Sequence, residues 1–115
     1  MHKMLIKINE EKLKNAGLDP EGFKAFIDSV FEKTGGHIIK EVQPDGSMMY
    51  VGNPLYENYL CYFGMAYSKF KYNKDFLNYA DKWIWLNDDD VQGDWSEEEC
   101  LEHCRRLNKN GKKGI

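Results

Sequence analysis

The sequence predicts an α+β fold in which a small antiparallel sheet, formed by an opening strand and one β-hairpin, packs against four to five helices. Three patterns predict it: a short apolar run at residues 4–8, apolar residues at helical spacing within 23–31, and two β-prone runs joined by a turn within 37–52. The chain has 115 residues, of which 42% are hydrophobic and 30% charged, and this is the size and composition of one globular domain. We expect that domain to span residues 1–108, with a flexible basic tail at 109–115.

Two helices are predicted after the opening strand. Asn9 is suited to cap a short helix that ends at Gly17. Asp19 and Pro20 give a stronger start signal, because aspartate accepts hydrogen bonds from the first backbone N–H groups and proline fits the first helical position. The residues that follow have the spacing of one helix face: Phe23, Phe26, Ile27, Val30 and Phe31.

The middle of the chain predicts the hairpin and two further helices. Residues 37–43 and 47–52 are β-prone, and the Pro-Asp-Gly sequence at 44–46 is typical of a turn. A helix is expected from residue 53 to about residue 70. Another is expected over 75–86, although its last apolar run also fits a strand.

A capping box predicts the last helix. Ser96 and Glu99 have the spacing in which the two side chains satisfy each other's backbone N–H groups. An apolar stripe follows at Cys100, Leu101, Cys104 and Leu107. We therefore expect a helix that begins near Ser96 and ends at Gly111.

Charge is segregated in the last quarter of the chain. The formal net charge is -3, and residues 88–102 hold eight acidic residues and no Lys or Arg. Such a surface repels nucleic acid and attracts a partner with a basic surface. We expect the partner-binding patch to consist of Asp88, Asp89, Asp90, Asp94 and Glu97, with Trp95 as an apolar anchor.

The same segment resembles the twelve-residue calcium loop of an EF-hand. Gly93 falls at the sixth position, where the loop turns sharply. The oxygen ligands would be Asp88, Asp90, Gln92, the backbone carbonyl of Asp94, Ser96 and Glu99. Gln92 replaces the usual Asp or Asn, and no second loop is present to pair with this one. Calcium is the one cofactor that the sequence suggests, as an alternative to a plain acidic loop running into a capped helix.

Two interpretations of the remaining features stay open. Twelve of the sixteen aromatic residues fall between Tyr50 and Trp85, where they form either the core or an exposed surface that would allow a homodimer. The order of elements up to Gly52 resembles a winged helix, which offers DNA binding as a further alternative. The presumed reading helix carries Glu21 and Asp28 at outward positions, so nucleic acid is not the expected partner.

The sequence also argues against several classes of protein. It has no nucleophile elbow, no phosphate-binding glycine loop and no zinc-protease motif, so we expect no enzyme activity. No apolar run reaches the ~18 residues that span a bilayer, so no membrane association is expected. The opening residues do not have the pattern of a signal peptide, and the three cysteines are an odd number. These features predict reduced thiols and a cytoplasmic location.

The expectation that follows is a small acidic protein-interaction module. Its size and charge are typical of inhibitors or immunity-type factors, such as those of phages and mobile elements, that dock onto a larger basic partner. This is an analogy of size and charge, and it does not identify the partner.

Overall fold

The structure is a computed structural model that describes residues 2–33, 35–53, 55, 59–89 and 94–111. Side chains are described for these residues except 59–60, 87–89, 94–98 and 108–111. The elements in chain order are β1 (His2–Ile8), α1 (Glu10–Asn15), α2 (Pro20–Glu32), β2 (Ile38–Val42), β3 (Met48–Gly52), α3 (Tyr59–Lys71), α4 (Lys74–Tyr79), β4 (Ala80–Asp89), β5 (Asp94–Glu99) and α5 (Cys100–Gly111).

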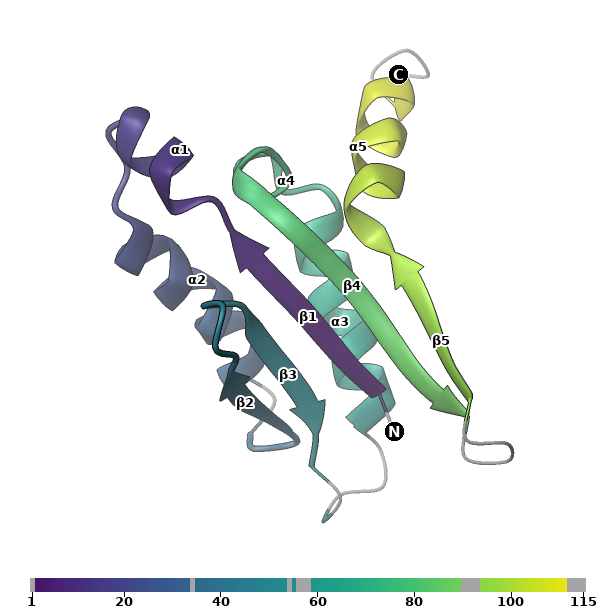
Figure 1. Ribbon diagram of the computed structural model, residues 1–115. Helices are drawn as coiled ribbons and strands as arrows, with labels where there is room; N and C mark the ends of the chain where they lie inside the picture. The colour runs from purple at the N-terminus through teal and green to yellow at the C-terminus, as the bar shows by residue number, and fades with distance from the viewer. Residues whose placement is uncertain (1, 34, 54, 56–58, 90–93, 112–115) are drawn as a thin grey trace.

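The strands form one antiparallel sheet in the order β2-β3-β1-β4-β5. In its centre, Met4 of β1 lies opposite Tyr50 of β3 and Trp85 of β4. The path from β1 to β4, with helices after the first and third strands, follows the ferredoxin-like β-α-β-β-α-β order. Strand β5 and helix α5 extend it at one edge (Figure 1). The predicted α+β class is confirmed, and the sheet has two strands more than expected.

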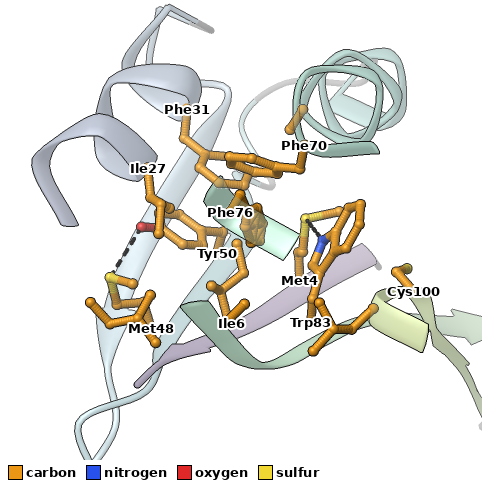
Figure 2. Close-up of a cluster of buried hydrophobic side chains, with 14 of the residues drawn as sticks. Met4, Ile6, Ile27, Phe31, Met48, Tyr50, Phe70, Phe76, Trp83 and Cys100 are labelled. Atoms are coloured by element: carbon orange, nitrogen blue, oxygen red, sulfur yellow. Dashed lines mark hydrogen bonds between the residues drawn. The ribbon is translucent and has the colours of Figure 1, made fainter. Parts of the chain in front are cut away.

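The core lies between one face of the sheet and the helices. Met4, Ile6 and Ile8 alternate along β1 and are all buried, because successive side chains of a strand point to opposite faces. Figure 1 shows α3 passing behind β1 and β4. Figure 2 shows the centre of the core, where the Phe31 and Tyr50 rings stack with centroids 3.8 Å apart.

The residues expected to cap the first two helices and to form the hairpin turn do so. The Asn9 side chain accepts a hydrogen bond from the backbone N–H of Lys12, and Asp19 accepts one from the N–H of Glu21. In the turn between β2 and β3, Asp45 accepts from the N–H of Ser47 at 2.9 Å, and Gly46 has φ of +87°. This left-handed conformation favours glycine, so the turn sequence determines the hairpin.

The predicted helix over residues 75–86 is wrong beyond its first turn. Helix α4 ends at Tyr79, and β4 begins at Ala80. Asn73 caps α4 by accepting from the N–H of Phe76. The apolar run that fits both a helix and a strand becomes a strand because β1 offers it a full hydrogen-bonded edge.

The start of the last helix also differs from the prediction. Ser96 lies in β5, and α5 begins at Cys100. The Glu99 carboxylate accepts from the N–H groups of Leu101 at 3.1 Å and Glu102 at 3.0 Å, so Glu99 acts as the N-cap. Helix α5 continues to Gly111, so the expected tail at 109–115 overlaps it, and residues 112–115 lie outside the described part.

The winged-helix resemblance does not extend to the whole sheet. Strand β4 pairs with the second edge of β1, which makes β1 a central strand of a five-stranded sheet. Helix α2 is packed against that sheet through the buried residues Ile27 and Phe31. None of the described helices has the length and apolar character needed to cross a membrane.

Candidate protein-binding groove

A groove lies between α2 and α3 on the helical side of the molecule. Its first part has a volume of about 330 Å³ and is lined by Phe26 and Val30 of α2 and Met65 and Ala66 of α3. Its second part, of about 360 Å³, shares Phe26 with the first and continues past Phe23 toward the loop before α2. The two parts share Phe26 and Asn73, and together we call them the α2–α3 groove.

The apolar residues of the groove are exposed to an unusual degree. Phe26 is 38% exposed, Met65 54% and Leu18, at the far end, 43%. The α2 stripe is wider than the contact with the sheet requires, because Ile27 and Phe31 already fill that contact and are buried. Helix α3 likewise buries Phe63 and Phe70 and leaves Met65 on its other side. The pair of helices therefore presents apolar surface on the side away from the core.

The two parts of the groove carry charges of opposite sign. Lys33 and Lys69 line the first part, and Asp19 and Asp75 line the second. The Asp19 carboxylate is already engaged at the N-terminus of α2. An α-helix has a partial positive charge at its N-terminus and a partial negative charge at its C-terminus. A partner helix with its N-terminus over the second part of the groove and its C-terminus over the first would therefore have each end beside charges of the opposite sign.

A second cluster, at the outer end of α2, consists of Asp28, Lys40 and Tyr50. The Tyr50 hydroxyl donates to one Asp28 oxygen at 2.6 Å, and the Lys40 ammonium lies 2.9 Å from the other. Beside them is an open depression of about 280 Å³, which Glu32 and Ile38 also line. Burial, and then the hydrogen bond to Asp28, raise the pKa of Tyr50 well above its usual value, so the phenol keeps its proton at neutral pH. The cluster therefore joins α2 to the hairpin.

The predicted partner patch lies on the hairpin of β4 and β5. In the register of these strands, Asp88 is opposite Trp95, Asp89 opposite Asp94, and Glu97 opposite Leu86. Asp90 lies outside the described residues, as do the side chains of the whole patch. The structure therefore brings the backbone of these residues together, and their role in binding stays a prediction.

The backbone of the calcium segment does not follow an EF-hand in its described part. Asp88 and Ser96 lie in paired strands, and Glu99 is opposite Ile84, four residues from Asp88 along β4. Four residues of a strand span about 13 Å, whereas calcium ligands lie ~2.4 Å from the ion. Asp88 and Glu99 are thus too far apart to bind one ion in this conformation. Gln92 is outside the described residues, and calcium binding as such stays a prediction.

The aromatic residues between Tyr50 and Trp85 mostly build the core. Phe63, Phe70, Phe76 and Trp83 are fully buried, and the indole N–H of Trp83 donates to the Met4 sulfur at 3.2 Å (Figure 2). Among the other described rings of this range, Tyr72 has 65% of its surface exposed, and Tyr62, Tyr67, Tyr79 and Trp85 are partly buried. For the four buried rings the core interpretation is confirmed, so they cannot form a homodimer surface.

The cysteine and histidine residues of α5 do not gather into a metal site within the described part of the chain. Cys100 and Cys104 are buried in the core, whereas His103 is exposed. The Cys104 thiol donates to the Tyr67 hydroxyl at 3.6 Å. The two thiols act as small apolar side chains that attach α5 to α3 and the sheet.

The sequence pattern places Phe26 and Val30 on one apolar helix face and does not predict a groove. The signal that points to it is the combination of a five-membered stripe on α2 with a helix α3 that is apolar nearly all round. Together, α2 and α3 carry more apolar residues than their two faces against the sheet can bury.

Replacing Tyr50 with Phe should lower stability by about 1 kcal/mol at neutral pH, because a buried hydrogen bond is lost. The difference should then change with pH. Above pH 10.0 the unfolded chain loses the phenol proton while the folded chain keeps it, so the contribution of Tyr50 falls as pH rises, by about 1.4 kcal/mol per unit. Urea unfolding of both proteins from pH 7 to 11 checks this. A difference that stays constant over that range would contradict the assignment.

Replacing Glu99 with Ala should cost about 1 kcal/mol of unfolding free energy, since α5 loses its N-cap. Replacement of Glu102, which is exposed one turn later, is the matched control and should cost less. Thermal melts with and without millimolar calcium make the measurement. We expect the Glu99 effect to be the same in both buffers. An effect present only with calcium would restore the EF-hand interpretation.

Comparison with known proteins adds no relationship to this picture. No family model, curated protein or solved structure matches the chain. What the molecule does must therefore be argued from its own surfaces.

Proposed function

We propose that this protein is a small protein-interaction module that binds an amphipathic helix of a partner in the α2–α3 groove. The observation that carries the proposal is the apolar channel with Phe26 and Met65 exposed along it. Helix-in-groove recognition needs such a channel, into which the partner inserts residues spaced i, i+3/4 and i+7. Phe and Met are residue types that are enriched at such interfaces.

The dimensions and charges of the groove specify the partner helix further. Helix α2 has 13 residues and is therefore about 20 Å long, which accommodates three to four turns of a partner helix. Lys33 and Lys69 favour the partner's C-terminal end or an acidic residue there, and Asp75 favours its N-terminal end. A helix in the opposite direction would place like charges together at both ends.

The acidic segment 88–102 is proposed to steer this association. Residues 88–102 carry eight negative charges and no Lys or Arg, and at physiological salt their field extends about 8 Å. Such a field raises the rate of encounter with a basic partner more than it raises affinity. The proposal thus combines a short-range apolar site with a long-range preference for a larger basic protein.

Selection from a displayed library of helical peptides, randomised on one face, tests the groove. We expect binders with apolar residues at i, i+3/4 and i+7 and with basic residues toward the N-terminal end. Met65→Glu should weaken their binding at least tenfold, because it puts a charge into the channel. Val42→Glu, at a 69% exposed position on β2, is the matched control and should leave affinity unchanged. Binders that tolerate Met65→Glu as well as Val42→Glu would place the binding surface elsewhere.

Stopped-flow kinetics with the selected basic peptides tests the steering. Replacing Asp88, Asp89, Asp90 and Asp94 with Asn should slow association several-fold at low salt and leave dissociation unchanged. The salt dependence of the association rate should fall as well. Since surface substitutions usually change stability by under about 0.5 kcal/mol, the melting temperature serves as the folding control. An unchanged association rate at low salt would remove the acidic segment from the mechanism.

A further inference from the structure

Strand β2 forms one edge of the sheet. In the strand order β2-β3-β1-β4-β5 it pairs with β3 on one side only, as Figure 1 shows. The pairing runs from Ile38 opposite Gly52 to Val42 opposite Met48 with no shift of register. An edge strand of this regular kind presents a row of backbone N–H and C=O groups with which another chain can pair. The free side of β2 therefore has the backbone geometry to accept a further strand.

Two hydrogen bonds show which backbone groups of β2 face β3. The N–H of Asn53 donates to the carbonyl of His37 at 2.8 Å, just before β2. The N–H of Gln43 donates to the carbonyl of Ser47 at 2.8 Å, just after it. Along an antiparallel pair, hydrogen-bonded residues alternate with residues that are not bonded across the pair. Residues 37, 39, 41 and 43 therefore bond toward β3, and the residues between them point their backbone groups the other way.

The groups that point away from the sheet are the N–H and C=O of Ile38, Lys40 and Val42, which we call the β2 edge. Among the described residues, none donates to these groups or accepts from them. Lysine often protects an edge strand, because its charge resists pairing with another chain. The Lys40 ammonium, however, lies 2.9 Å from the Asp28 carboxylate of α2, which holds it on the helical side of the sheet. The β2 edge is thus open to a pairing strand.

The open depression of about 280 Å³ lies beside the β2 edge and can receive a side chain from an added strand. Ile38 and Lys40 of β2 line it, together with Phe31 and Glu32 of α2. Cross-strand neighbours point to the same face of a sheet, so the residue opposite Ile38 would direct its side chain toward this depression. Strand addition at a sheet edge obtains affinity from main-chain hydrogen bonds and specificity from such pockets.

The charge of the depression favours a basic side chain. Asp28 and Glu32 are the carboxylates among its lining residues, and Lys40 is the cation. Lys40 is paired with Asp28, and no described Lys, Arg or His forms an ion pair with Glu32. A lysine or arginine would lay its aliphatic stem against Phe31 and Ile38 and bring its charge to Glu32. The site thus complements a basic residue placed opposite Ile38.

We infer that the β2 edge binds an extended segment of a basic partner protein, which adds an antiparallel strand to the sheet. The segment carries Lys or Arg opposite Ile38 and a β-branched residue opposite Ile39, whose side chain is 45% exposed on the other face. A second copy of β2 is the poorer occupant, because a two-fold pairing centred on the strand places Lys40 opposite its own copy.

This site is separate from the α2–α3 groove. Asp28, Phe31 and Glu32 line the depression, whereas Phe26 and Val30 line the groove and lie on another face of α2. The depression and the two parts of the groove share no lining residue. Binding at the β2 edge therefore does not depend on the proposed binding of a helix.

Amide hydrogen exchange of the full chain, measured by NMR, tests the pairing. The probe is a peptide of about ten residues, selected from a displayed library with β-branched residues at every second position, a pattern that disfavours helices. In the free protein, the N–H groups of Ile38, Lys40 and Val42 should exchange faster than those of Ile39 and Glu41, which bond to β3. The bound peptide should slow exchange at Ile38, Lys40 and Val42 at least tenfold.

Two variants of Val42 test the backbone contact itself. Val42→Pro removes one N–H of the β2 edge and should weaken peptide binding at least tenfold, since proline cannot donate. Val42→Ala keeps that N–H and is the matched control, which should change affinity less than twofold. Val42 is 69% exposed at the end of an edge strand, where proline is tolerated, so both variants should fold, and circular dichroism melts verify it.

Glu32→Gln tests the depression. It should weaken the binding of peptides with Lys or Arg opposite Ile38 several-fold, because the carboxylate that meets the basic side chain is lost. Glu11→Gln, on α1, changes the net charge equally and should leave affinity unchanged. Equal effects of the two variants would remove the depression from the site.

The outcomes distinguish this inference from the groove and from self-association. Binders that leave exchange at Ile38, Lys40 and Val42 unchanged, or that tolerate Val42→Pro, would overturn it, as would a library that yields no binder. Slow exchange of these three N–H groups in concentrated protein without peptide would assign the β2 edge to a second copy and overturn it as well. Met65→Glu should not change peptide binding, since Met65 lies in the groove.

Discussion

Strand β1 is hydrogen-bonded on both sides, and this constraint determines what each face of the sheet carries. Met4 and Ile6 are held opposite Tyr50 and Met48 on one side and opposite Trp85 and Trp83 on the other. A slip of one residue would turn Leu5 and Lys7 toward the helices and bury a lysine. The register is therefore strongly specified, and the buried face of the sheet depends on it.

The helices cover one face of the sheet, and this layering leaves apolar surface on both sides of the molecule. On the helical side, Ile27 and Phe31 reach the core, while Phe26 on the same stripe remains in the groove. On the other side, Leu5 lies between Met49 of β3 and Ile84 of β4, and all three side chains are partly exposed. A two-layer fold has one buried interface, so apolar residues in excess of it must face outward. These residues are where a partner gains the most from displacing water.

The polar groups with defined geometry serve the fold. Asp28 accepts from Tyr50 and pairs with Lys40, Asp19 caps α2, and Glu99 caps α5. Each carboxylate satisfies a donor that burial or a helix end would otherwise leave without a partner. The well-placed titratable groups therefore join elements together. The surface that we propose for helix binding is apolar. The charged residues beside it would determine in which direction a partner helix binds.

Local sequence determined the elements whose signals are contained within a few residues. Asp19 and Pro20 begin α2, and Gly46 with its positive φ makes the hairpin turn, because these effects depend only on nearby backbone groups. Tertiary structure decided the rest. The run at 83–86 fits a helix or a strand, and pairing with β1 made it a strand. Which apolar residues stay exposed was also decided there: Phe26 is 38% exposed, although Ile27 and Phe31 of the same helix face are buried. A stripe or an alternation shows that a face is apolar, but only the packing of distant elements decides whether that face is covered.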